Sequence, residues 1–227
     1  MDVLDQLAEP AVALTGRVDD LLAAAGAPDG HRIWPLLRRL RVLPGDAVRA
    51  VLELRSEALA GAGEVGGELR RAYHETGAVL ADGGSWQGPA AEVYAAHRSG
   101  LAEHVTGLTG RVDATTGYAE AVAGWIDETR YALARTLADV LGSAEAVAVL
   151  TAPPYAAGVE PGGLPSAGGV PPGPAAAEIG ARILATVDEA YDRAEALPRR
   201  WAAELDLLDH RLADIPTVRP DGGRLVL

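Results

Sequence analysis

The longest pattern of apolar spacing in the chain lies between residues 94 and 140. Apolar or small side chains recur there at steps of three and four residues, with a step of seven near each end, for more than six heptads. Such a repeat predicts a helix that packs along a partner helix, as in a coiled coil. Pro89 suits the first turn of this helix, which would be about 90 Å long if unbroken to residue 150. The stripe comprises Tyr94, Leu101, Val105, Leu108, Val112, Thr115, Ala119, Val122, Ile126, Thr129, Leu133 and Val140.

A second helix is expected from Asp46, a residue type that caps helix N-termini, to about Leu80. Its own heptad stripe is predicted to face a partner helix, with two small residues in the middle of the stripe. Together the two helices would form a long antiparallel hairpin over about residues 46–150. The stripe comprises Val51, Leu54, Ala58, Gly61, Val65, Ala72 and Val79.

The rest of the chain also has helical patterns. A helix is expected over residues 3–25, broken or restarted at Pro10. The Pro- and Gly-rich residues 151–173 predict a linker, and a last helix over 174–213, kinked at Pro198, is expected to pack on the bundle. Residues 214–227 are expected to form a flexible tail. The predicted fold class is therefore all-α, an elongated helical bundle with its N-terminal helices and hairpin in residues 1–150.

Charge and composition exclude several classes of protein. The net charge of -12 repels phosphate backbones, so we expect no nucleic-acid partner. The chain has no Cys, which excludes disulfides and cysteine-based zinc sites. Two acidic residues near the N-terminus, Asp2 and Asp5, argue against a general secretory signal, and no apolar run is long enough to predict a transmembrane segment.

Motifs that resemble chemical sites fail on their context. Residues 61–66 match the dinucleotide fingerprint, but they follow a helical pattern and not a strand. Ser85 lacks the glycine two residues later that a nucleophile elbow requires. His97 and His104 share a helix face without a third ligand at an obvious spacing. We therefore predict a protein that is not an enzyme, with no cofactor and no catalytic, cofactor-binding or metal-ligating residues.

The sequence Trp86-Gln87-Gly88 falls in the break between the two predicted hairpin helices. An indole at a helix–helix turn can close the end of a bundle, and Gly88 allows a tight backbone turn before the helix that begins at Pro89. With the small residues Ala90 and Ala91 following, this region resembles the WXG100 family, whose members are small helical hairpins with Trp-x-Gly at the turn. The resemblance covers less than half of the chain, which would be an enlarged member with extra N- and C-terminal helices.

The resemblance implies a substrate or associated factor of type VII (ESX) secretion, made in the cytoplasm and exported without a general secretory signal. It implies as partners a secretion-system ATPase or a paired WXG-type protein, with a homodimer as an alternative. Many such proteins carry Tyr-x-x-x-Asp/Glu as part of their export signal. Tyr131 is followed four residues later by Arg135 and fails this pattern, whereas Tyr191 and Glu195 fit it. The same pair also has the spacing of an ordinary helix-face contact.

Two functions are compatible with this pattern. The first is a non-enzymatic secreted or cell-envelope protein that acts through helix-mediated protein–protein interaction. The alternative is an intracellular all-helical adaptor, or an amphipathic surface-binding protein, unrelated to secretion. The terminal helices also leave two assembly states open, a bundle closed within one chain and a dimer.

Overall fold

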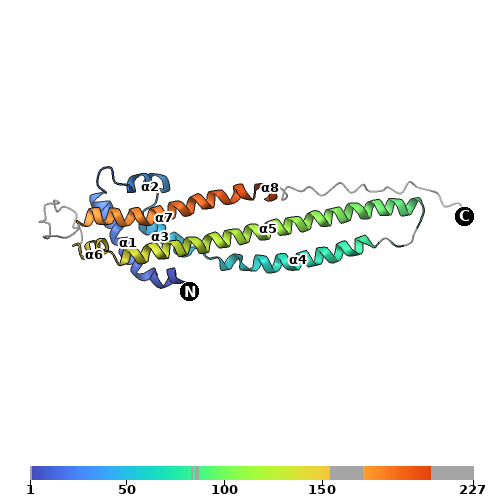
Figure 1. The fold of residues 1–227 in the computed structure, drawn as a ribbon, viewed down its shortest axis with the longest axis horizontal. Coiled ribbons are helices and arrows are strands. Elements are labelled where there is room, and N and C mark those ends of the chain that lie inside the picture. Colours follow the sequence, from blue (N-terminus) through green and yellow to red (C-terminus); the bar gives the residue numbers. More distant parts are fainter. Residues whose placement is uncertain (1, 83, 85–86, 154–170, 206–227) are drawn as a thin grey trace. The chain divides into compact units, whose positions relative to one another are not determined.

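A computed structural model describes residues 2–82, 84, 87–153 and 171–205. Within these ranges all regular secondary structure is helical, which confirms the all-α class (Figure 1). The helices are α1 (Val3–Ala25), α2 (Ile33–Leu40), α3 (Pro44–Glu53), α4 (Glu57–Ala81), α5 (Pro89–Leu141), α6 (Ala144–Thr151), α7 (Pro172–Arg200) and α8 (Ala202–Leu205).

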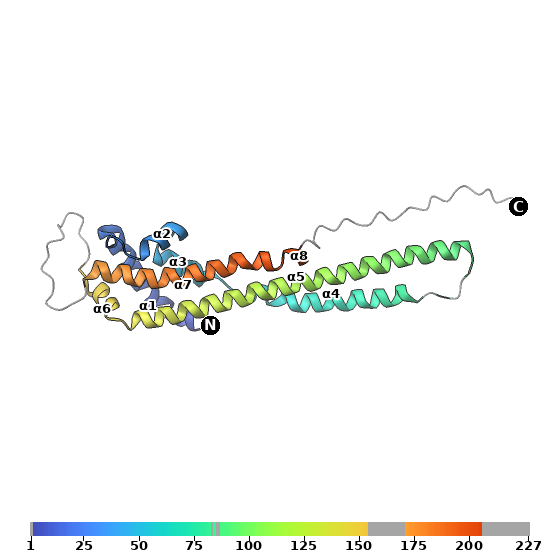
Figure 2. The same ribbon diagram turned by 45° about the horizontal axis from the view of Figure 1, so that its top comes forward.

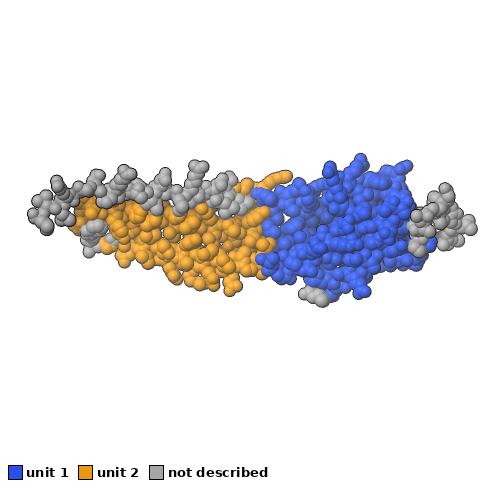
Figure 3. All heavy atoms as spheres, turned by 180° about the vertical axis from the view of Figure 1, so that it is seen from behind, with its two compact units in different colours: residues 1–58, 121–198 blue, residues 59–120, 199–227 orange. Residues whose placement is uncertain are grey.

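The chain divides into two compact units, which are coloured separately in Figure 3. Unit 1 comprises residues 1–58 and 121–198, and unit 2 comprises residues 59–120 and 199–227. Each unit therefore contains one part of α5. The predicted linker over 151–173 and the tail over 214–227 lie mainly or wholly outside the described residues.

Unit 1 contains the hydrophobic core. Figures 1 and 2 show α1, α2, α3 and α6 gathered around the end of α5 and the first part of α7. The apolar faces of α1, α3, α5 and α7 meet because each carries buried residues at helical spacing, and α2 contributes the buried Ile33. The largest fully buried side chains are Leu4, Leu14, Ile33, Leu133, Leu137, Ile179, Ile183 and Leu184. The predicted stripe of the longest helix supplies Ile126, Thr129, Leu133 and Val140 to the buried residues of this unit.

The first helix begins at a capping box. The Asp2 carboxylate accepts a hydrogen bond from the Asp5 amide at 2.9 Å, and the Asp5 carboxylate accepts one from the Asp2 amide at 3.4 Å. The expected break at Pro10 is absent, because α1 runs from Val3 to Ala25 with this proline inside it. The Pro10 ring lies on the exposed side of α1, away from the core.

The helix expected from Asp46 to Leu80 is instead two helices, α3 and α4, separated at residues 54–56. Leu54 adopts an extended backbone with φ -64° and ψ 132°. The guanidinium of Arg130 donates to the carbonyls of Val51, Leu52 and Leu54 at 3.0–3.1 Å. This side chain satisfies carbonyls that a continuing helix would otherwise pair, so the chain can change direction here.

The later helices also differ from the expected bounds. The long helix ends at Leu141, and α6 begins after Ser143, whose hydroxyl accepts a hydrogen bond from the Ala146 amide at 3.2 Å. Pro198 lies inside α7, and the helix is interrupted at Trp201, before α8. Residues 206–213 of the predicted last helix lie outside the described part of the chain.

Within unit 2, α4 and the first part of α5 run in opposite directions (Figure 2). Arg70 Nε lies 2.6 Å from Asp113 Oδ1, and a Cβ built on Gly63 would lie 3.4 Å from Glu120 Oε1. A Cβ on Gly66 would overlap the hydroxyl of Thr116. Glycine thus lets the backbone of α4 approach α5 closely at these positions.

The stripe predicted for residues 58–79 lies on an exposed face of α4 and not on the face that meets α5. Ala58, Gly61, Val65, Ala72 and Val79 are exposed, and the close contacts with α5 are made by the glycine positions instead. Val65 is 56% exposed and Val79 is 75% exposed. The prediction failed because apolar periodicity identifies large side chains, whereas close approach at Gly66 needs no side chain.

Candidate functional site

The turn between α4 and α5 contains two glycines in the left-handed region of backbone space. The φ angles of Gly84 and Gly88 are +57° and +111°. A Cβ on Gly88 would meet nothing within 4 Å, so the backbone angle, and not lack of space, favours glycine here. The Gly88 carbonyl accepts hydrogen bonds from the amides of Ala91 and Glu92 at 2.8 and 3.2 Å and so starts α5.

Of the predicted Trp-x-Gly residues, the structure therefore describes Gly88 and Gln87, both exposed. Trp86 lies outside the described residues, as does Ser85. Pro89 is the first residue of α5, as expected for proline at a helix start.

The candidate export residues Tyr191 and Glu195 lie one turn apart on α7, in unit 1. Both are exposed, and Tyr191 is 51% exposed. The intervening Asp192 forms an ion pair with the guanidinium of Arg39 on α2. The same guanidinium also lies 2.9 Å from Asp188 Oδ2. The hydrogen bond that Arg39 donates to the Asp192 carboxylate is the main cause that raises the pKa of Arg39. Desolvation opposes this change, and the charges of Asp188, Asp192 and Glu195 add to it. The acidic face beside Tyr191 is thus partly neutralised by α2.

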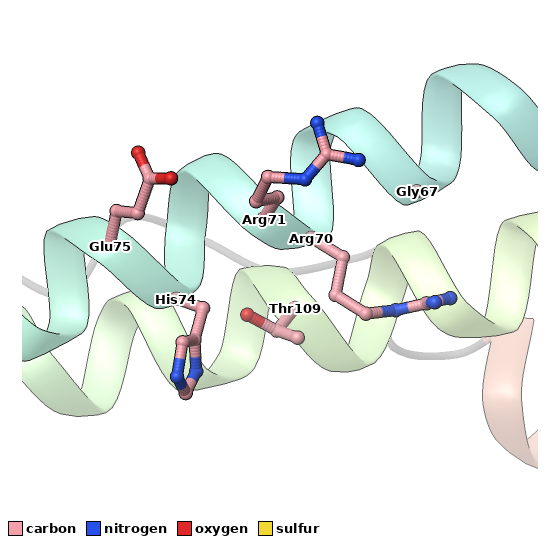
Figure 4. A pocket seen from close by; sticks show the side chains of 6 residues that line it. All are labelled: Gly67, Arg70, Arg71, His74, Glu75 and Thr109. Carbon is pink, nitrogen blue, oxygen red and sulfur yellow. The ribbon is translucent and has the colours of Figure 1, made fainter.

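A shallow groove lies on unit 2 between α4 and α5 (Figure 4). It has a volume of about 480 Å³ and is lined by Gly67, Arg70, Arg71, His74, Glu75 and Thr109. Arg70 forms an ion pair with Asp113, and the Thr109 hydroxyl donates a hydrogen bond to the Val105 carbonyl at 3.1 Å. Figure 4 shows Arg71 and Glu75 pointing away from α5, so the lining groups do not converge on one point. The groove therefore lacks the arrangement of nucleophile and base that catalysis needs.

A polar cluster in unit 1 was missed by the sequence analysis. The Arg130 side chain is 5% exposed; its Nε lies 2.6 Å from Asp2 Oδ2, and one terminal nitrogen lies 2.7 Å from Asp5 Oδ1. The hydrogen bond from Arg130 is the main cause that lowers the pKa of Asp2 to about 2, although burial opposes it. The cluster ties the start of α1 to the end of α3, so it has a structural role. No local pattern around residue 130 indicates it, because its partners lie more than 70 residues away in the sequence.

The other sequence motifs are placed as follows. The glycines of residues 61–66 lie inside α4, where their amides belong to a helix and are not presented to a pyrophosphate. Among the described residues, no group of three His, Cys, Asp or Glu side chains is arranged to hold a metal ion, and His97 is exposed. No helix in the same residues has both the length and the apolar composition needed to cross a membrane.

Comparisons of the chain with protein-family models, with curated proteins and with solved structures found no match.

Proposed function

We propose that the chain is a non-enzymatic type VII secretion substrate or secretion-associated protein of WXG100-like type. The observation that carries this proposal is Gly88, two residues after Trp86 in the sequence: it has a φ of +111° and its carbonyl accepts the first hydrogen bonds of α5. In this proposal, α4, the turn and the first part of α5 form the WXG-type helical hairpin. Unit 1 supplies the extra helices of an enlarged member.

The exposed heptad stripe on α4 supports a role in protein–protein interaction. Val65, Ala72 and Val79 are seven residues apart and all exposed, so they form one apolar line on the helix surface. A line of this kind is suited to contact with a helix of a partner, because apolar area removed from water stabilises the complex by about 25 cal/mol per Å². The partner proposed is a paired WXG-type protein or the secretion ATPase, with a homodimer as the alternative.

Tyr191 and Glu195 are proposed as the export signal. Their exposure on one face of α7 leaves them accessible to a protein that reads both side chains. In this proposal, export takes the protein from the cytoplasm to the outside of the cell or to the cell envelope.

The second candidate function is an intracellular helical adaptor. The exposed apolar line on α4 favours it equally, because such a line binds a partner helix in any compartment. Only the first function requires the secretion apparatus, so the experiment tests whether export depends on that apparatus.

The test compares the amount of the protein outside cells that have an active type VII ATPase with the amount outside cells in which the ATPase is inactivated. We expect export only in the former. The double variant Trp86→Ala, Gly88→Ala should abolish export, while Gly100→Ala, at an exposed helical glycine with open space around it, should not. Circular dichroism of each variant separates a loss of export from a loss of folding. Retention in the cytoplasm of cells with an active ATPase would refute the secretion proposal and favour the adaptor.

The export signal has its own matched control. Tyr191→Ala should reduce export, whereas Tyr131→Ala changes an equally accessible tyrosine, 63% exposed, that lacks the acidic residue four positions later. Equal export of the two variants would show that Tyr191 and Glu195 are an ordinary helix-face pair.

A further inference from the structure

Helix α2 and the residues around it carry a local excess of positive charge. Residues 30–45 contain four arginines and no Asp or Glu, although the chain as a whole has a net charge of -12. The helix lies beside α7 in unit 1, as Figures 1 and 2 show. Its apolar face is turned into the hydrophobic core, where Ile33 is fully buried and Leu36, Leu37 and Leu40 are partly buried. The arginines therefore lie outside this apolar face.

One flank of α2 faces α7, and its arginines are paired with carboxylates there. Arg32, at the N-cap of α2, forms an ion pair with Glu178. Arg39 forms ion pairs with Asp188 and Asp192, which lie one helical turn apart on α7. This flank shows the kind of surface that the arginines of α2 bind, a helix that presents carboxylates one turn apart.

The other flank consists of Trp34, Arg38 and Arg41, and we call it the outer flank. Steps of four and three residues join its members, so they follow one side of the helix to its end. All three residues are exposed. Among the described residues, neither Arg38 nor Arg41 has a carboxylate as an ion-pair partner. The outer flank thus offers two guanidiniums and an indole to a partner.

The backbone and hydrogen bonds of the outer flank fix its shape. Trp34 Nε1 donates to the Pro28 carbonyl at 3.0 Å, and Arg38 Nε donates to the Trp34 carbonyl at 3.2 Å. Arg41 has a left-handed backbone, with a φ of +57°, and its amide donates to the Leu37 carbonyl at 2.9 Å. Glycine is the usual residue in this conformation at a helix end, so arginine lowers stability there. The Arg41 side chain therefore does not serve the stability of α2.

We propose that the outer flank of α2 binds an acidic amphipathic helix of a partner protein. Two carboxylates one turn apart on that helix pair with Arg38 and Arg41, in the way that the α7 carboxylates pair with Arg39. An apolar side chain of the same helix covers the indole of Trp34. Tryptophan and arginine are among the residues that most often carry the binding energy of a protein interface. The outer flank is separate from the apolar line on α4, and the inference does not rest on the export proposal.

Charge and burial favour an acidic helix over other anionic partners. A nucleic acid or an anionic membrane presents many negative charges, which the net charge of -12 repels. A helix that lies in a membrane surface inserts its apolar face, and the apolar face of α2 is already packed against the core. An acidic helix needs only the two guanidiniums and the indole that the outer flank presents.

The test measures the binding of an alanine-based helical peptide that carries two Glu residues one turn apart and a Leu on the same face. Fluorescence anisotropy of the labelled peptide gives its Kd for the full chain. The same peptide with Gln in place of both Glu residues is the control. We expect the Glu peptide to bind at least about tenfold more tightly, because an Arg–carboxylate pair is stronger than an Arg–amide hydrogen bond.

The variant Arg41→Gly separates binding from folding. It removes the guanidinium, and glycine suits the left-handed backbone, so the Glu peptide should bind at least about tenfold more weakly while the melting temperature does not fall. Arg38→Gln should weaken binding in the same way. Arg135→Gln is the matched control, because it removes the same charge from an exposed arginine on α5 in unit 1. Its Kd should change by less than about twofold.

Three results would overturn the proposal. The first is equal binding of the Glu and Gln peptides, and the second is an unchanged Kd for Arg41→Gly. The third is Arg41-dependent binding to vesicles that contain phosphatidylserine, or to a DNA duplex, without binding to the Glu peptide. That result would assign the outer flank to a membrane or a nucleic acid.

Discussion

Asp19 couples the stability of unit 1 to pH. Its carboxylate accepts a hydrogen bond from the Gly45 amide, whose nitrogen lies 3.1 Å from both oxygens, at the first turn of α3. The residue at the helix N-cap, Leu43, makes no side-chain cap of its own, so Asp19 on α1 caps α3 across the unit. Burial raises the pKa of Asp19 to about 6; the Gly45 hydrogen bond opposes this change, while the charges of Asp46 and Asp20 add to it.

The magnitude follows from linkage between protonation and folding. The folded-state pKa of about 6 and the ordinary value of 3.8 differ by an amount that corresponds to about 3 kcal/mol, at 1.36 kcal/mol per pKa unit. Because the folded pKa is the higher one, the folded state holds the extra proton between these values. The stabilising contribution is fully present below pH 3.8 and is lost as the pH rises through about 6. At neutral pH the ionised carboxylate therefore destabilises the fold by up to about 3 kcal/mol.

The substitution Asp19→Asn keeps an oxygen acceptor for the Gly45 amide and removes the titration. We expect its free energy of unfolding, relative to that of the wild type, to rise by up to about 3 kcal/mol between about pH 4 and about pH 7.5. Urea unfolding followed by circular dichroism measures this difference, and Asp20→Asn, at the exposed neighbour, is the control. A relative free energy of unfolding that is constant with pH for Asp19→Asn would refute the argument.

Further substitutions test the packing and the turn before α5. Arg130→Gln should lower the free energy of unfolding by about 3–5 kcal/mol, as for a broken buried ion pair, and a loss below 1 kcal/mol would contradict its structural role. Gly180→Ala should destabilise by about 1–3 kcal/mol, because the added carbon would lie 2.8 and 3.0 Å from side chains of α2 and α3. Gly61→Ala, in open space on α4, should instead stabilise by about 0.5–1 kcal/mol. A thermal melt in which Gly180→Ala is more stable than Gly61→Ala would contradict this argument. Gly88→Ala should cost about 1–3 kcal/mol through its φ of +111°, whereas Gly100→Ala, at a helical glycine in open space like Gly61, should stabilise by about 0.5–1 kcal/mol in the same melt.

The sequence was sufficient for the helical class, for α1 and for the buried stripe at the end of α5. The stripe through Ile126, Leu133 and Val140 was predicted, and these residues are buried in unit 1. Pro89 was predicted as a helix start, and α5 begins there. These predictions succeed because burial of large apolar side chains leaves a helical period in the sequence.

Two of the failures depend on contacts that the local sequence pattern does not show. The break at residues 54–56 follows from donation by Arg130, which no local pattern announces. One close contact of α4 with α5 is made by Gly66, which carries no apolar side chain to detect. Of the candidate site, the sequence supplied the left-handed Gly88, but not the pairing of Asp192 with Arg39 beside Tyr191.

The glycine contacts of α4 bear on the exposure of Val65 and Val79. A helix that meets its neighbour through glycines brings the two backbones together, so its large side chains are directed to other faces. In unit 2, Val65 and Val79 are therefore on the surface although they follow a heptad repeat. The residues that hold α4 to α5 and the residues proposed to bind a partner then occupy different faces of one helix. The proposed partner binding can for this reason be tested at Val79 without changing the contact between Gly66 and Thr116.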